Sequence, residues 1–123
     1  MNLKSLTLVM VTIIATKAWC GDEKRGEKLF NDRSCSLCHS LGKEGTATSG
    51  PNLAGVTKRQ NRAWLERWIK SPDLMAKDPD VQKMAGKYSA TMPNMALSDA
   101  EVDDLISYFE GLDGKVRAKK KSD

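Results

Sequence analysis

The feature that most constrains this chain is a five-residue motif, Cys35-Ser36-Leu37-Cys38-His39. Two cysteines separated by two residues and followed directly by histidine form the pattern for covalent attachment of haem. On one helical turn, the two thiols can each add to a vinyl group of a porphyrin and form a thioether. The imidazole of the next residue then projects over the macrocycle and binds the iron from one side. The motif therefore predicts a large bound cofactor, which the rest of the chain must wrap.

Three other interpretations of the two cysteines are open. A redox-active dithiol of this spacing belongs in a βαβ context, which the sequence lacks. A structural zinc site needs a second Cys/His pair, and His39 is the only histidine in the chain. A short-loop structural disulfide between Cys35 and Cys38 is the third. We prefer haem attachment over these three.

An iron ligand on the second face of the haem must come from elsewhere in the chain. With His39 used on the first face, a methionine thioether is the natural choice, because it suits low-spin iron and raises the reduction potential relative to a second imidazole. Two of the methionines lie on expected helical stretches and are interpreted as core residues. Two others lie in a proline-containing segment before the last helix. These two pairs are Met75 with Met84, and Met92 with Met95.

Residues 1–20 are predicted to be a signal peptide. Lys4 precedes a ten-residue apolar stretch over residues 6–15, which is shorter than the about 20 residues that span a bilayer. Cleavage after Cys20 leaves small residues at the last and third-last positions, and cleavage after Ala18 is the second choice. A lipoprotein acylated at Cys20 and an uncleaved membrane anchor are the weaker alternatives. The predicted compartment is the bacterial periplasm or its equivalent.

The remaining chain fits a single domain over residues 21–114, followed by a basic mobile tail over residues 115–123. Without residues 1–20 the chain carries 18 basic and 16 acidic residues, and without the tail its net charge is −2. A charge run at a terminus is usually a solvated end, with docking to a partner or a membrane as the alternative. Nothing in the sequence resembles a nucleic-acid-binding surface.

Strand signals are nearly absent and apolar positions repeat with helical spacing, which predicts an all-α fold. A first helix is expected over residues 22–31, and an irregular loop rich in Gly, Ser, Thr and Pro over residues 40–58. A loop of this length in a compact domain is normally functional or wraps something. A further helix is expected from the Asn61 cap to about Ser71. Short helices should follow at Pro72, capped by Ser71, and at Pro79, capped by Asp78.

The last helix has the clearest signals in the chain. Ser98 and Glu101 match the S-x-x-E capping box, which marks a helix start. Gly111 is expected to end the helix as a left-handed cap. Between them, apolar residues recur at helical spacing on one face: Val102, Leu105, Ile106 and Phe109.

Over residues 22–112, the order of these pieces resembles the class I cytochrome c family. The attachment motif alone is moderately specific. Its position just after the first helix disfavours four-helix cytochromes of the c-prime type, which carry it near the C-terminus. The resemblance implies a cytochrome c fold of about four to five short helices around one haem c, attached through Cys35 and Cys38. It is carried by Gly26 and Phe30, by Gly50-Pro51-Asn52-Leu53, by Thr91-Met92-Pro93, and by Leu105 with Tyr108.

The resemblance also implies roles for particular residues. In this family the thioether ligand is the methionine directly before proline, which points to Met92, with Met95 as the runner-up. The Pro51 carbonyl would accept the Nδ1–H of His39 and so fix the ring. Gly26 would let the first helix cross the last one closely.

Aromatic residues are expected to line the haem. Trp64 and Trp68 share one helix face and are interpreted as core or as a wall of the haem pocket. The family often has an indole or phenol that donates to a haem propionate. That role is open to Trp64, Trp68 or Tyr88.

The function implied by the resemblance is that of a non-enzymatic electron carrier, whose haem c iron cycles between Fe(III) and Fe(II) with His39 and Met92 as axial ligands. Its partners would be redox proteins, with no small-molecule substrate and with membrane contact left open, and the chain is expected to be a monomer. The segments around residues 50–72 and 92–98 are similar to small periplasmic cytochromes that serve copper-containing terminal reductases and oxidases. An enzyme, such as a haem peroxidase or a nitrogen-oxide reductase, and a gas sensor or carrier are the alternatives. Both need an open iron site.

Overall fold

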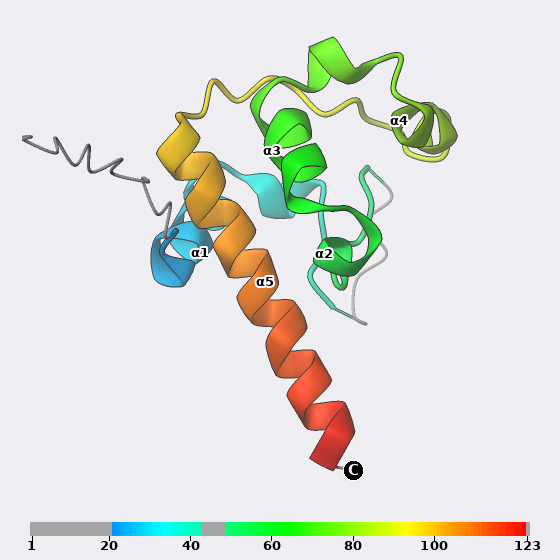
Figure 1. Ribbon diagram of the computed structural model, residues 1–123. Helices are drawn as coiled ribbons and strands as arrows, with labels where there is room; N and C mark the ends of the chain where they lie inside the picture. The colour runs from blue at the N-terminus through cyan, green and yellow to red at the C-terminus, as the bar shows by residue number, and fades with distance from the viewer. Residues whose placement is uncertain (1–20, 43–48, 123) are drawn as a thin grey trace, which may run out of the picture.

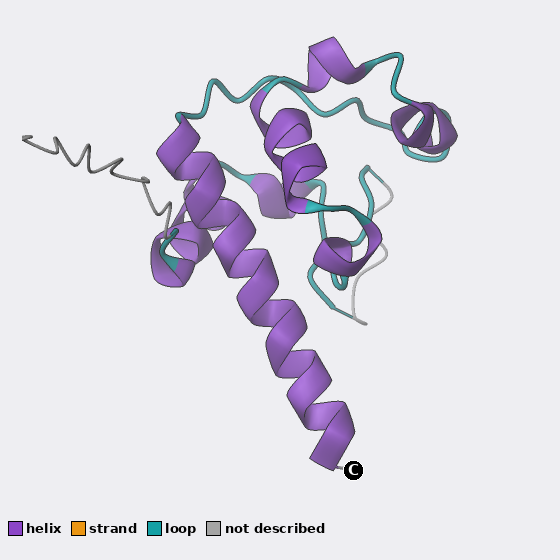
Figure 2. Ribbon diagram, viewed as in Figure 1, coloured by secondary structure: helices purple, strands orange, loops and turns teal. Residues whose placement is uncertain are grey.

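The computed structural model describes residues 21–42 and 49–122. Helices and loops account for all of these residues, with no strand among them (Figures 1 and 2). The all-α class and the expected number of helices are confirmed. The predicted signal peptide, residues 1–20, lies outside the described part. The helices are α1 (Glu23–Asp32), α2 (Val56–Arg59), α3 (Arg62–Lys70), α4 (Pro79–Met84) and α5 (Asp99–Ser122), with 3-10 turns η1 (Cys35–Leu37) and η2 (Pro72–Met75).

Helix α1 crosses α5 at a glycine. A Cβ atom on Gly26 would lie 2.0 Å from the carbonyl oxygen of Asp104 and 2.7 Å from the Cβ of Tyr108, closer than real atoms approach. Only a residue without a side chain fits there. One turn later Phe30 packs edge-on against Phe109 of α5, with ring centroids 6.1 Å apart. The expected close crossing of the first and last helices is confirmed.

Most of the predicted helix starts are present. In the capping box the Glu101 carboxylate accepts the Ser98 N–H at 2.8 Å, and the Ser98 hydroxyl accepts the Glu101 N–H at 3.3 Å. Ser71 differs from the prediction, because its side chain makes no capping hydrogen bond. The turn after it is 3-10, closed by the Leu74 N–H on the Ser71 carbonyl at 3.1 Å. Side-chain oxygens cap α1, α3 and α4 at Asp22, Asn61 and Asp78.

The prediction that Gly111 ends the last helix is wrong, since α5 continues to Ser122. The turn after Gly111 still faces the body of the protein, because Asp113 is buried there. Gly111 instead makes room for a side chain of α1: a Cβ atom on it would lie 2.4 Å from the Cδ of Glu23. The expected domain boundary at residue 114 therefore falls inside α5, whose last turns project beyond the other elements (Figure 1).

The expected irregular loop over residues 40–58 ends in a helix. Its last residues form the first part of α2, whose Val56 is buried. Residues 43–48 of this loop lie outside the described part, and the remainder is irregular. Local sequence does not signal α2, because the group that holds its start is Asp113, 56 positions away from Thr57.

Two buried carboxylates of α5 join it to the helices on either side. Asp104 accepts hydrogen bonds at 2.8 and 3.0 Å from the guanidinium of Arg25 on α1. Asp103 pairs with Arg62 at the start of α3. The hydrogen bonds from Arg25 hold the pKa of the Asp104 carboxyl below its usual range. Helix α5 is thus held by α1 and by α3, and it forms the central support of the fold.

Candidate haem site

The attachment motif lies on a single tight turn. Ser34 adopts a left-handed backbone conformation (φ 58°), which is uncommon for a residue with a side chain, and leads the chain from α1 into η1. The His39 N–H donates to the Cys35 carbonyl at 3.0 Å and closes the turn. The two cysteines and the histidine therefore lie close together, as the motif predicts: Cys35 begins the 3-10 turn η1, and Cys38 and His39 follow it directly.

The ring of His39 is fixed from one side. Its Nδ1 lies 2.8 Å from the Pro51 carbonyl oxygen, the contact that the family resemblance implies. A carbonyl only accepts, so Nδ1 carries the proton and the lone pair on Nε2 is left for a metal. Gly50 is pressed onto the same ring: a Cβ atom there would lie 3.0 Å from the His39 Cε1 and 2.9 Å from the Cys38 carbonyl.

Buried polar atoms test whether these residues fit a haem. Trp64 Nε1 and Ser40 Oγ are buried and have no hydrogen-bond partner within the described chain. Leaving a buried donor unpaired costs about 1–3 kcal/mol, so such atoms call for a partner outside the described residues. A haem propionate would accept from the indole. Of the three aromatic candidates, Trp64 is the one with a buried, unpartnered N–H, and it stacks on Trp68 with centroids 5.8 Å apart.

The other interpretations of the cysteines find no support. Cys35 and Cys38 are both free thiols. Burial raises the pKa of the Cys35 thiol, whereas an attacking dithiol needs a lowered pKa. A zinc site needs further ligands, and the described residues hold no group of three or more Cys, His, Asp or Glu side chains that could bind a metal ion.

The four methionines fall into different surroundings. Met75 is buried, and Met84 and Met95 pack half-buried against the hydrophobic core. Met92 is half-buried in the loop between α4 and α5. Asn94 stabilises a turn within this loop, because its Oδ1 accepts the Ala96 N–H at 2.9 Å. The two helical methionines are core residues, as expected, while the choice between Met92 and Met95 as iron ligand stays a prediction.

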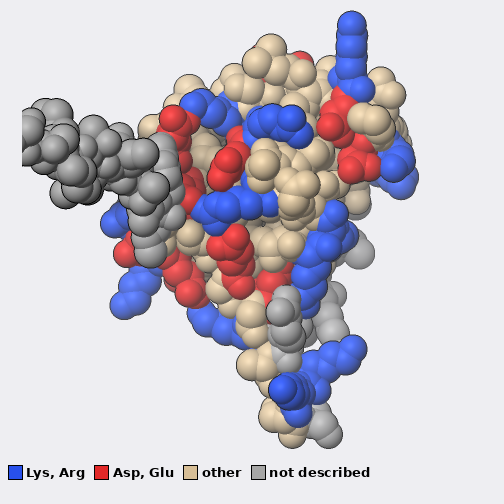
Figure 3. All heavy atoms as spheres, viewed as in Figure 1, with Lys and Arg blue, Asp and Glu red and all other residues tan. Residues whose placement is uncertain are grey.

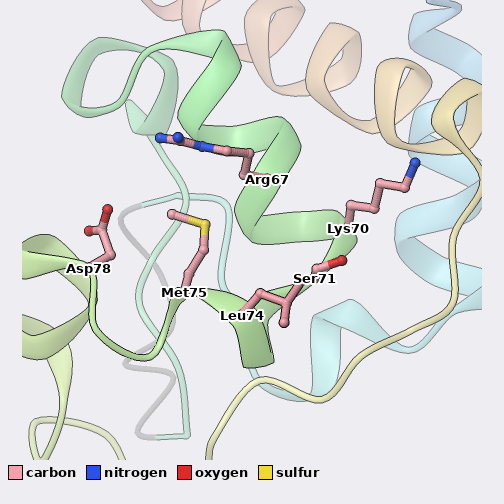
Figure 4. Close-up of a pocket in the computed structure, with 6 residues that line it drawn as sticks. All are labelled: Arg67, Lys70, Ser71, Leu74, Met75 and Asp78. Carbon is pink, nitrogen blue, oxygen red and sulfur yellow. The ribbon is translucent and has the colours of Figure 1, made fainter.

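A groove of about 390 Å3, which the sequence does not predict, lies beside α3 and η2 (Figure 4). Its most exposed apolar residue is Leu74, at 80%. It includes no residue of the attachment motif. It is lined by Arg67, Lys70, Ser71, Leu74, Met75 and Asp78.

Comparisons of the sequence agree with this geometry. Residues 23–113 match the family model described as cytochrome c. The chain is 34% identical over 100 residues to cytochrome c2 of Rhodobacter capsulatus, which covers 75% of this chain and 66% of that protein. It is 34% identical over 94 residues to cytochrome c oxidase subunit 2 of Bacillus subtilis, covering 72% of this chain. The match spans only 26% of that subunit.

Comparisons of the structure give the same answer. Cytochrome c from Rhodothermus marinus superimposes with a TM-score of 0.68 at 26% identity, over 76% of this chain and 78% of that one. A cytochrome c domain from Pseudomonas putida gives a TM-score of 0.64 at 42% identity, over 75% and 91%.

The chain belongs to the cytochrome c family, as a class I c-type cytochrome. It carries haem c attached covalently through Cys35 and Cys38. No helix in the described part of the chain is long and apolar enough to cross a membrane.

Proposed function

We propose that this cytochrome passes single electrons between proteins of a periplasmic respiratory chain, with His39 and Met92 filling both axial positions of its iron. The observation that carries the proposal is the 2.8 Å hydrogen bond from His39 Nδ1 to the Pro51 carbonyl. It fixes the ring and leaves the lone pair on Nε2 available for a metal. A ligand held in this way moves little when the iron is reduced.

The surroundings of the loop before α5 support Met92 as the second ligand. The side chain of Met95 is already packed against the hydrophobic core. Met92 stands directly before Pro93, where the family carries its thioether ligand. With both axial positions filled, a small substrate has no place at the iron, and we therefore propose that the protein is not an enzyme.

Docking of a redox partner is proposed at the attachment turn. Leu37, between the two cysteines, is 78% exposed and offers an apolar contact where the haem edge would lie. We expect docking there to be weak and partly electrostatic; acidic and basic side chains are mixed on the face of the molecule drawn in Figure 3. The match to a protein named cytochrome c oxidase subunit 2 supports a terminal oxidase as acceptor. A copper-containing reductase or oxidase as partner stays a prediction.

Residues 1–20 support a proposal for the cellular compartment of the protein. Their charge and apolar length suit a signal peptide, and haem attachment to reduced thiols after export fits the same route. We propose that the protein acts in the periplasm, either as a soluble shuttle or as a small subunit of a larger assembly.

The test is the visible absorption spectrum of the oxidised, haem-loaded protein. Thioether ligation of ferric haem produces a weak long-wavelength band. We expect wild type and the matched control Met95→Ala to show this band and Met92→Ala to lose it. Reduced wild type should bind carbon monoxide poorly, because its sixth position is occupied.

The opposite results separate the alternatives. Loss of the band in Met95→Ala alone would make Met95 the ligand. Absence of the band in wild type, with ready carbon monoxide binding, would mean an open iron and would favour an enzyme or a gas sensor over an electron carrier.

A further inference from the structure

We infer that Asp113 of α5 is a positioning residue for His39. It holds one end of the segment 51–57, and the other end of this segment carries the Pro51 carbonyl that fixes the histidine ring. The contacts that carry this inference belong to the polypeptide itself. Its consequence for the iron rests on the proposed axial role of His39.

Both oxygens of the Asp113 carboxylate accept hydrogen bonds from this segment. The residue is 4% exposed. One oxygen accepts the Gly55 N–H at 2.6 Å, and the other accepts the Thr57 N–H at 3.1 Å and the Thr57 hydroxyl at 2.6 Å. All three donors are uncharged. A buried carboxylate is costly unless it is hydrogen-bonded, so its presence here indicates that these bonds are needed.

The segment between the two ends is stiffened by its own hydrogen bonds. The Ala54 N–H donates to the Asn52 side chain at 2.9 Å, and the Val56 N–H donates to the Leu53 carbonyl at 3.0 Å. The guanidinium of Arg59 spans the turn and donates to the carbonyls of Ala54 at 2.6 Å and Asn52 at 2.9 Å. A displacement at Gly55 is therefore passed on toward Pro51.

The near end of the segment holds the histidine and the residue that follows it. The Pro51 carbonyl accepts from His39, and the Leu53 N–H donates to the Ser40 carbonyl at 2.8 Å. The backbone at Gly50 packs against the same ring. The histidine therefore takes its position from this segment, and the segment takes its position from α5 through Asp113.

Support from α5 matters because α5 is itself fixed by α1 and α3. Gly55 adopts a left-handed conformation (φ 75°), which a chain held only by local contacts would leave easily. The hydrogen bond from the Gly55 N–H to Asp113 holds this glycine against the central helix α5. Without it, we expect the hydrogen bond between His39 and Pro51 to open more often.

The experiment follows two protons in the haem-loaded protein by NMR in D2O, namely the Nδ1 proton of His39 and the amide proton of Leu53. The variants are Asp113→Asn, which keeps the shape and loses one acceptor, and Thr57→Val, which removes the hydroxyl donor. Arg62→Gln is the control, because Arg62 pairs with Asp103 and Glu110 of α5 and has no hydrogen bond to the segment in the described structure. The global unfolding constant of each protein is measured by denaturant titration.

In Asp113→Asn we expect both protons to exchange about tenfold faster than the change in the global unfolding constant explains, as for one lost hydrogen bond. Thr57→Val should change both in the same direction and less. Arg62→Gln should show no excess exchange over its change in global stability.

Exchange in Asp113→Asn that only tracks global unfolding would overturn the inference and leave Asp113 a purely stabilising residue. Faster exchange of the Leu53 amide with an unchanged His39 Nδ1 proton would also overturn it. Failure of the proposed axial ligation would appear separately, in the absorption spectrum of wild type, and the Leu53 amide would still test the role of Asp113.

Discussion

The two sides of α5 are built differently. The framework side consists of α1 and its contacts with α5. There, Gly26 lets the two helices approach closely, and Arg25 donates a hydrogen bond to the buried Asp104. On the haem side, which consists of residues 35–42 and 49–57, α3 and the loop over residues 85–98, buried polar atoms of Ser40 and Trp64 have no partner within the described residues. A non-glycine residue is also held in a left-handed conformation there, at Ala96.

This difference shows which parts of the fold the polypeptide completes alone. On the framework side, the buried Asp104 is paired with Arg25 and the two helices pack closely, all within the polypeptide. Haem-side residues leave buried polar atoms whose hydrogen-bond partners the bound cofactor would supply. Substitutions on the framework side should therefore act mainly on stability, and substitutions on the haem side should act on stability only when haem is bound.

The largest expected effect is on the framework side, at Gly26. A methyl group there meets the Asp104 carbonyl at 2.0 Å, so Gly26→Ala must push α1 away from α5. We expect a loss of about 3 kcal/mol in the free energy of unfolding, measured by denaturant titration of the haem-loaded protein. The matched control is Gly114→Ala in α5, another helical glycine, where a Cβ atom meets nothing within 4 Å. It should gain about 0.5–1 kcal/mol from helix propensity, and an equal loss in both variants would contradict this account.

A smaller effect is expected on the haem side, at Trp64. If a propionate accepts from its indole, Trp64→Phe should cost the haem-loaded protein about 1 kcal/mol more in free energy of unfolding than Trp68→Phe. The control residue stacks on the first ring, and no unpartnered buried nitrogen is found on it in the described structure. Denaturant titration of both variants measures the difference. A Trp64→Phe variant at least as stable as Trp68→Phe would mean that the indole N–H stays unpaired when haem is bound.

Sequence predicts best those features, on either side of α5, that depend on residues close together in the chain. Capping at Asn61 and the Ser98–Glu101 box are local signals, read correctly because donor and acceptor lie three residues apart. Periodicity gave the buried face of α5 for the same reason. The prediction at Gly111 was wrong because a glycine can either end a helix or make room for a neighbouring side chain. The sequence alone does not distinguish the two, and here the glycine makes room for Glu23.

On the haem side, sequence predicted the parts that form a motif and missed the parts that depend on distant contacts. The attachment turn and the contact from His39 to Pro51 follow from short patterns and a family resemblance. The start of α2 and the role of Asp113 do not, because they join residues 56 to 58 positions apart in two elements. The assignment of Met92 as ligand stays a prediction.

The ion pair of Arg25 with Asp104 should make the framework side sensitive to acid. Arg25 holds the pKa of Asp104 below its ordinary value of 3.8, so the stabilisation is complete above that value and is lost as pH falls through the folded-state pKa. Arg25→Gln should therefore be less stable than wild type at neutral pH. The two proteins should converge below about pH 4. Because Arg25 is 64% exposed, solvent screening keeps the difference smaller than at Gly26 or Trp64. Unfolding titrations across this pH range measure it, and a gap that persists in acid would rule out Asp104 as its source.

The smallest effect is expected in the last turn of α5, which belongs to neither the framework side nor the haem side. Lys119, Lys120 and Lys121 are exposed in its last turn, and the basic end projects away from the body (Figure 3). Their interaction with the helix dipole is weak at such exposure, so replacing all three with Gln should change the free energy of unfolding by about 0.5 kcal/mol or less. Denaturant titration checks this, with the haem spectrum as a control for the site. A loss as large as that of Gly26→Ala would show that these turns pack against the domain.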